Sequence, residues 1–120
     1  MTGTNTGFFG FVRGGTTIQN IIFDSTCHFS ADERCGSLIG FVQAKAGGVI
    51  TLNNIVNFGS VTSGSKVAGG IVAAGHTNND HPVINMANCV NAGLVKSTGG
   101  DKAAGLLGWN KSASISTLKA

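Results

Sequence analysis

The residues best suited to chemistry lie in one long polar segment, GHTNNDHPV at residues 75–83. His76 and His81 flank Asp80 there, and imidazole and carboxylate groups are common ligands of divalent metal ions. A further ligand is not evident, and the spacing matches no zinc motif. We therefore predict no metal site and keep His76, Asp80 and His81 as weak candidates for a ligand site. The alternative hypothesis is a solvated polar insertion.

The three cysteines, Cys27, Cys35 and Cys89, lack the surroundings of nucleophiles or zinc ligands. Their number is odd, their spacing is irregular and no CxxC pair occurs, so no disulfide framework is indicated. In the repeats described below they align with apolar or small residues, Cys27 for example with Val61. We expect structural thiols, and a Cys27–Cys35 disulfide stays open for an oxidising compartment.

The carboxylates are too scattered to predict an enzyme. A glycosidase or lyase needs a pair of them in one groove, whereas four of the five acidic residues fall in predicted turns. Asp24 is the exception, and the other repeats place Phe58 and Ala92 at its position. Phosphate-binding glycine motifs are also missing. We predict no catalytic residue, no cofactor and no enzymatic activity.

The composition indicates a folded chain with an apolar interior. Of 120 residues, 19 are Gly, 42% are hydrophobic and only 11% are charged, which is too apolar for intrinsic disorder. The net charge of +3 is spread without a basic cluster, so we expect no binding to nucleic acid. We also expect no membrane insertion and no signal peptide, because the required apolar runs are missing.

A repeat of about 34 residues organises the chain. NIVNFGSV (54–61) and NCVNAGLV (88–95) align without gaps, and NIIFDSTC (20–27) fits more loosely. The shared asparagines form two rows, Asn20, Asn54 and Asn88, and Asn57 and Asn91. A small residue recurs after paired apolar residues at Gly10, Gly40, Ala73 and Gly108. We predict one domain over residues 1–120, a fragment of a longer repeat array.

Short β-branched segments alternate with Gly-, Asn- and Ser-rich turns within each repeat, as in VITLNNIVNFGSVTSG (49–64). Helical periodicity is missing, so short strands are indicated. Short strands in tandem repeats of this length predict an all-β fold, a β-solenoid of three to four coils. Such coils stack about 4.8 Å apart, so that equivalent residues lie over one another.

This stacking predicts architectural roles for the repeated residues. Apolar pairs such as Leu38–Ile39 and Ile71–Val72 would form buried columns, and the glycines beside them would permit close backbone approach. The asparagines would hydrogen-bond along the stack and adopt left-handed turn conformations. Phe11, Phe41 and Trp109 are equivalent and predict an inward aromatic column.

These motifs resemble those of the GLUG repeat family. GSLIG (36–40), GGIVA (69–73) and AGLLG (104–108) resemble its glycine-rich half, and residues 54–61 and 88–95 resemble its N-C-x-N-x-G-x-V half. The resemblance extends from about residue 7 to residue 118. It implies a β-solenoid repeat from large secreted or surface-attached, adhesin-like proteins, and therefore an extracellular or cell-surface location.

We therefore expect a non-catalytic structural or interaction module, either an adhesin-like stalk or a self-assembling filament unit. The expected partners are further copies stacked end to end as a homo-oligomer, since open strand edges invite pairing, and a glycan or host-surface ligand. The main alternative is a carbohydrate-binding or carbohydrate-active β-helix that stacks the three equivalent aromatic residues on sugars. Ice binding is a third alternative, although Asn85 interrupts the row of Thr17 and Thr51.

Overall fold

The computed structural model describes residues 4–13, 15–43, 48–75, 83–100, 102–110 and 114–118, with the backbone alone at 43, 75, 109–110 and 114–118. These residues form sixteen strands and no helix, so the all-β prediction is confirmed. In the same ranges, no helix is long and apolar enough to cross a membrane.

The strands belong to four parallel sheets, which we name A to D. Sheet A contains β1 (Asn5–Thr6), β5 (Arg34–Gly36), β9 (Val67–Gly69) and β14 (Lys102–Ala104). Sheet B contains β2 (Phe9–Arg13), β6 (Ile39–Gln43), β10 (Val72–Gly75) and β15 (Leu107–Asn110). Sheet C contains β3 (Thr16–Phe23), β7 (Val49–Asn57), β11 (Val83–Ala87), β12 (Val90–Asn91) and β16 (Ser114–Leu118). Sheet D contains β4 (His28–Ala31), β8 (Ser60–Ser63) and β13 (Val95–Ser97).

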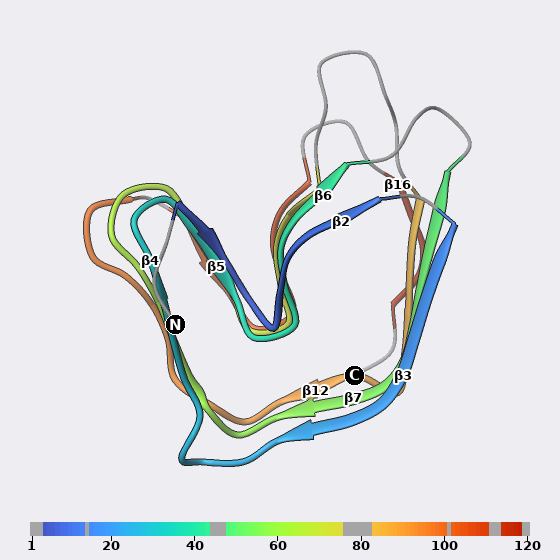
Figure 1. The fold of residues 1–120 in the computed structure, drawn as a ribbon, viewed down its shortest axis with the longest axis horizontal. Helices are drawn as coiled ribbons and strands as arrows, with labels where there is room; N and C mark the ends of the chain where they lie inside the picture. Colours follow the sequence, from blue (N-terminus) through green and yellow to red (C-terminus); the bar gives the residue numbers. More distant parts are fainter. Residues whose placement is uncertain are drawn as a thin grey trace.

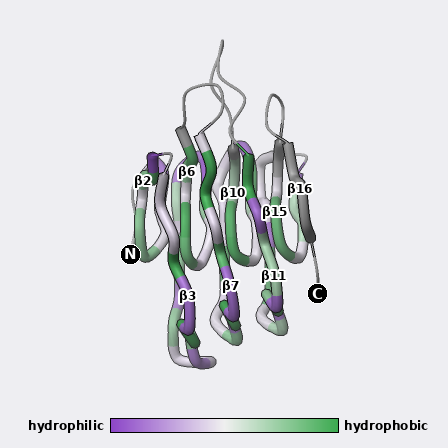
Figure 2. The backbone as a smooth tube through the Cα atoms, turned by 90° about the vertical axis from the view of Figure 1, so that its right-hand side faces the viewer, coloured by the Kyte–Doolittle hydropathy of each residue, from purple (hydrophilic) through white to green (hydrophobic). Residues whose placement is uncertain are grey.

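The chain enters the sheets in the order A, B, C, D and then returns to sheet A (Figure 1). Each repeat thus places its strands beside those of the repeat before it, as the side view in Figure 2 shows. The backbone register follows the sequence spacing, because Thr17 pairs with Thr51 and Thr51 pairs with Asn85. The first repeat, β1 to β4, therefore supplies one edge strand to every sheet.

The expected fold class needs a correction beyond the all-β level. The described strands form four separate parallel sheets of three to five strands, and this finding replaces the β-solenoid of three to four coils predicted from the sequence. The physical reason lies in the Gly-, Ser- and Asn-containing turns between consecutive strands, which end one set of ladder hydrogen bonds before the next begins. Pairing therefore runs only between equivalent strands of one sheet.

A left-handed asparagine lies within sheet C in each of the first three repeats. The φ angle is 61° at Asn20, 57° at Asn54 and 54° at Asn88. Asn is one of the few residues other than Gly that adopts this conformation readily. β3 and β7 bend along their length (Figure 1), and the break between β11 and β12 falls at Asn88. This row therefore fixes where the strands of sheet C change direction.

Sheets A and B form the two arms of a V, with β5 descending into the turn from which β6 rises (Figure 1). The turn holds small buried residues, and the Ser37 hydroxyl donates a hydrogen bond of 2.6 Å to the carbonyl of Gly70. A Cβ atom on Gly40 would lie 2.7 Å from the backbone nitrogen of Thr6, closer than real Cβ contacts allow. Glycine there lets β6 approach β1 across the V.

The apolar side chains of all four sheets form one buried cluster. Its largest members with no exposed surface are Leu38, Ile39, Ile50, Leu52, Ile55, Ile71, Ile84 and Met86. Burying such a side chain contributes about 1.5–3 kcal/mol each, so this cluster supplies most of the stabilisation of the stacked sheets.

Candidate functional site

The first repeat holds most of the phenylalanines of the chain. Of the seven, five lie in this repeat: Phe8, Phe9, Phe11, Phe23 and Phe29. Phe23 and Phe29 are each only 5% exposed, and they pair with the smaller Asn57 and Val61 of the second repeat. Two large rings therefore fill the interior at this end of the stack, where each sheet ends in an edge strand.

The rings of the first repeat form a connected aromatic cluster. The centroid of Phe8 lies 5.1 Å from that of Phe9 and 5.8 Å from that of Phe23. Phe23 in turn packs edge-to-face on Phe29, with 5.3 Å between centroids and 80° between ring planes. Such pairs contribute about 0.5–1.5 kcal/mol beyond the area that they bury. The cluster therefore holds Phe8 and Phe9 against a rigid support.

Three of these rings are nevertheless exposed. The exposed fractions are 56% for Phe8, 39% for Phe9 and 46% for Phe11, and we call these three residues the aromatic edge. Phe9 pairs with Ile39 and Ile39 pairs with Val72, and both of these partners are fully buried. The difference arises because a further repeat covers Ile39, whereas no described strand covers Phe9.

An open hollow of about 260 Å³ adjoins the aromatic edge. Phe8, Phe23, Cys27, His28 and Phe29 line it. Its walls are mainly ring carbons, with one thiol and one imidazole as polar groups. This volume lies just below the usual range for small-molecule sites, about 300–1,000 Å³, and suits a single apolar side chain.

The segment between β3 and β4 is longer than its counterpart in the second repeat. Phe23 pairs with Asn57 and His28 pairs with Ser60, so residues 24–27 occupy the place of residues 58–59. Asp24 fixes this loop by accepting hydrogen bonds from the hydroxyl and the backbone N–H of Thr26, and these bonds lower the pKa of Asp24.

This longer loop overturns one alignment predicted from the sequence. Phe29 pairs with Val61, so the expected equivalence of Cys27 and Val61 is wrong. The carbonyl of Cys27 instead accepts a hydrogen bond from the N–H of Ser60, at 3.0 Å. A gap-free comparison of the repeats could not reveal the two additional residues.

His28 and Ser60 make a contact that the sequence did not indicate. His28 Nδ1 lies 2.7 Å from Ser60 Oγ, and the two residues are paired neighbours of β4 and β8. A nucleophilic serine also requires a group that orients the base and donors for the oxyanion. Within the described ranges Ser60 is the one hydrogen-bond partner of His28, so the contact is a cross-strand pair without triad geometry.

The predicted row of small residues is in register across sheet B. Phe9, Ile39, Val72 and Leu107 pair in sequence, and each precedes one member of the row Gly10, Gly40, Ala73 and Gly108. Ala73 is fully buried, so its methyl group fits where the other repeats carry glycine.

The first asparagine row lies at the surface. Asn54 Nδ2 donates to Oδ1 of Asn20 at 3.0 Å, across two repeats. Asn88 differs, because its Nδ2 donates to Oδ1 of Asn53 at 3.1 Å. The row is therefore linked by side chains at each step, although the last link shifts by one residue.

The second asparagine row lies inside. Asn57 has no exposed surface, and its Nδ2 donates to Oδ1 of Asn91 at 2.8 Å. Each of the two side chains also accepts a hydrogen bond from a glycine N–H two residues later, at Gly59 and Gly93. Phe23 takes the position of Asn57 in the first repeat, so the aromatic cluster covers one end of this row.

The predicted inward aromatic column is wrong. Phe11 is 46% exposed, its ring lies 5.7 Å from that of Phe41, and Ala74 interrupts the row before Trp109. The guanidinium carbon of Arg34 lies 5.1 Å from the centre of the Phe41 ring, close enough for a cation–π contact between the arms of the V.

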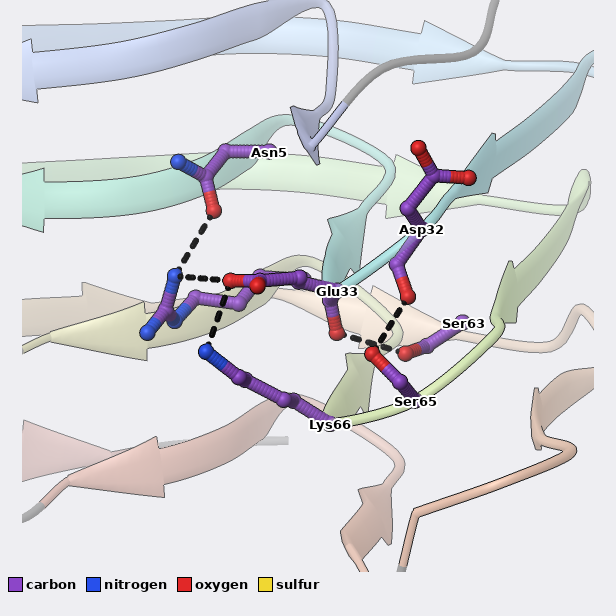
Figure 3. A network of polar contacts seen from close by, with 7 residues as sticks. Asn5, Asp32, Glu33, Ser63, Ser65 and Lys66 are labelled. Carbon is purple, nitrogen blue, oxygen red and sulfur yellow. Dashed lines mark hydrogen bonds and ion pairs between the residues drawn. The ribbon is translucent and has the colours of Figure 1, made fainter.

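Polar side chains connect the starts of three repeats (Figure 3). Arg34 Nη1 donates to Asn5 Oδ1 and pairs with Glu33 Oε2, each at 3.1 Å. Lys66 Nζ lies 2.8 Å from the same carboxylate oxygen, and this contact lowers the pKa of Glu33. The arrangement joins neighbouring strands of sheet A and has no geometry suited to catalysis.

Among the remaining candidates, the part of the chain that the structure describes offers no metal site. His76, Asp80 and His81 lie outside the described residues, which contain no group of three metal-ligating side chains. The three cysteines are free thiols, and burial raises the pKa of Cys35 to about 11 and also raises that of Cys89.

Neither a family model, nor a curated protein, nor a solved structure matches the chain. The resemblance to GLUG repeats therefore stays a prediction from the sequence. Within the described residues, the surface that combines exposed aromatic rings with unpaired strand edges is the end face of the first repeat, and the functional proposal rests on that surface.

Proposed function

We propose that this chain is a non-catalytic structural module that associates with further copies of itself through the end face of its first repeat. The observation that carries the proposal is the contrast between Phe9, 39% exposed, and its buried equivalents Ile39 and Val72. In the inner repeats, the neighbouring repeat covers this position. A second copy placed on the first repeat would cover Phe8, Phe9 and Phe11 in the same way.

The strand edges support the same partner. β1, β2, β3 and β4 are edge strands of sheets A to D, and edge strands present backbone N–H and C=O groups suited to another strand. The aromatic edge also gives this face an exposed apolar patch, and such patches on soluble proteins commonly mark contact sites. A partner with parallel strands at the same spacing fits both features, and another copy of this chain has them.

The resemblance to GLUG repeats supports a wider setting for this module. In that setting the chain is part of an extracellular or surface-attached protein, and its self-association extends an adhesin-like stalk. A further repeat encoded directly before residue 1 would cover the aromatic edge within one chain and would contradict self-association at this face. Sequencing the flanking coding region also tests the wider setting, because that setting requires a segment that directs export. A neighbouring catalytic domain without further repeats would contradict it.

Sedimentation velocity over a wide concentration range tests the self-association. We expect the average mass of the wild-type protein to rise with concentration, and F9K to weaken association at least tenfold. F58K is the matched control, since Phe58 is 49% exposed but lies between β7 and β8 of the second repeat, away from both end faces of the stack. A wild-type protein that stays monomeric at all concentrations, or equal weakening by F58K, would overturn the proposal.

A second candidate function is binding to carbohydrate. It is favoured by the rings of Phe11 and Phe41. Their centroids lie 5.7 Å apart and their planes are tilted by 30°, so that they could stack on a sugar. Calorimetric titration against a glycan panel distinguishes the two functions. Binding that F11A abolishes would favour carbohydrate recognition, and no heat with any glycan would exclude it for that panel.

A further inference from the structure

Resting on this proposed function, we infer that the copies associate head to tail, with the fourth repeat of one copy placed on the first repeat of the next. Leu106 and Leu107 would then lie over Phe8 and Phe9. Every copy would then point in the same direction along the assembly.

Each repeat carries a pair of apolar residues at the turn into sheet B, at 8–9, 38–39, 71–72 and 106–107. Neighbouring repeats cover the two middle pairs, whereas the first and last pairs keep exposed surface. Leu38, Ile39, Ile71 and Val72 have no exposed surface. At one end Phe8 and Phe9 are exposed, and at the other Leu106 and Leu107 are only partly buried. One head-to-tail contact would cover both ends at once, because Leu107 already occupies the same register position as Phe9.

The direction of the backbone hydrogen bonds favours this polarity. The N–H of Phe9 donates to the carbonyl of Leu38 in the next repeat, at 2.7 Å. The N–H groups of Leu38 and Ile39 donate likewise to Ile71, and those of Ile71 and Val72 to Leu106. At the turn between sheets A and B, these donors thus point toward the following repeat.

The direction of these hydrogen bonds also determines which backbone groups, donors or acceptors, lie free at each end of the row. By the same pattern, the N–H groups of Leu106 and Leu107 would point away from the third repeat, and the carbonyl of Phe8 is the equivalent acceptor at the other end. Head-to-tail contact would place these donors on that acceptor. Two first repeats in contact would offer this carbonyl no donor from the same row, because the N–H groups of Phe8 and Phe9 already donate to the second repeat.

The charges at the joint are compatible with this contact. Asn5, Arg34, Val67 and Lys102 occupy one row of sheet A, so that Lys102 of one copy would lie beside Asn5 of the next. Asn5 carries no charge, so Lys102 would face no like charge directly in this row, and the Arg34 guanidinium bonded to Asn5 is paired with Glu33. Because the two contacting surfaces differ, the contact is heterologous, and if it continues the parallel stacking of the repeats it extends into an open filament instead of a ring.

Disulfide trapping tests the register. Neighbouring parallel strands lie about 4.8 Å apart, within the Cα separations of about 4.4–6.8 Å that a disulfide spans. In a C27S background, F9C protein is mixed with L107C protein and oxidised. A second pair, N5C with K102C, leaves the aromatic edge intact. F58C, in the second repeat and away from both end faces, replaces the second partner in the control mixture.

We expect each matched pair to form the mixed dimer at least tenfold faster than either protein forms its own dimer, and at least tenfold faster than the F58C control. Faster trapping of F9C with F9C would establish head-to-head contact and overturn this inference, while the proposed self-association would stand. Association of the wild type without trapping of either pair would also overturn the inference. A wild type that stays monomeric would overturn both proposals.

Discussion

Asn57 donates a hydrogen bond of 2.8 Å from Nδ2 to Oδ1 of Asn91, the residue 34 positions later. Asn57 is fully buried, and its Oδ1 also accepts the N–H of Gly59 at 2.9 Å. One side chain thus holds a turn within its own repeat and a contact with the next repeat. Polar groups satisfied in this way specify a stacking register that apolar contacts alone would leave open.

Replacement of Asn57 tests how much this bond contributes. We expect N57A to lower the free energy of unfolding by about 2–4 kcal/mol, since the buried N–H of Gly59 loses its acceptor and Oδ1 of Asn91 loses a donor. N91A is the control, because Asn91 is only half-buried and should lose less. Urea unfolding measures both variants, and equal losses would contradict a role for burial.

The left-handed conformation of Asn54 predicts an unusual pattern of substitution. Because φ is 57° there, N54G should cost almost nothing, whereas N54V should lose about 1–2 kcal/mol through contact of its Cβ with the backbone. T62V, in the extended strand β8, serves as the control for introducing valine. Thermal unfolding of the three variants provides the comparison, and equal stability of N54G and N54V would exclude conformational strain.

Gly40 and Gly105 should respond oppositely to the same substitution. A Cβ on Gly40 would meet backbone atoms of Thr6 at 2.7 and 2.8 Å, so G40A should lose about 1–3 kcal/mol. A Cβ on Gly105 would meet nothing within 4 Å, and G105A should be neutral or more stable by up to about 1 kcal/mol. Chemical unfolding of both variants measures the difference, and similar effects would contradict close approach of β6 to β1.

The thiols should differ in reactivity and in their effect on stability. Burial raises the pKa of Cys35 to about 11, above the ordinary value of 9.0, and raises that of Cys89 in the same direction. We expect a disulfide reagent at pH 8 to modify one thiol rapidly, and C27S to remove that phase. All three thiols should react in denaturant.

The sign of the pH effect follows from the raised pKa of Cys35. The unfolded chain loses this proton near pH 9 and the folded chain only near pH 11, so the contribution to stability is full below pH 9. It should be lost as the pH rises toward 11. C35A should remove this part of the alkaline loss, and an unchanged pH profile would contradict the assignment.

Glu33 provides the corresponding prediction at acid pH. The hydrogen bond from Lys66 lowers the pKa of Glu33 below its ordinary value of 4.5, so its contribution is present above that value and is lost as the pH falls through the folded pKa. K66M should raise the pKa of Glu33 toward 4.5, as measured by NMR titration of the carboxyl carbon. K96M, in sheet D, should leave it unchanged.

Local patterns in the sequence determined the elements of this protein and much of their register. Alternating β-branched residues and Gly- and Asn-rich turns predicted strands because these preferences act within a few residues of the chain. The repeat spacing placed Thr17, Thr51 and Asn85 in one row, as the backbone pairing has them. Because the strands of successive repeats are parallel and in register, residues one repeat length apart along the chain become neighbours in space.

Only the tertiary structure decided how the rows face one another and which side chains reach solvent. Phe11 is exposed instead of inward, and the loop at residues 24–27 moves Phe29 into the place predicted for Cys27. The division into four separate sheets likewise replaced the predicted fold class. These features depend on contacts between segments distant along the chain, so the repeat of about 34 residues in the sequence could not predict them.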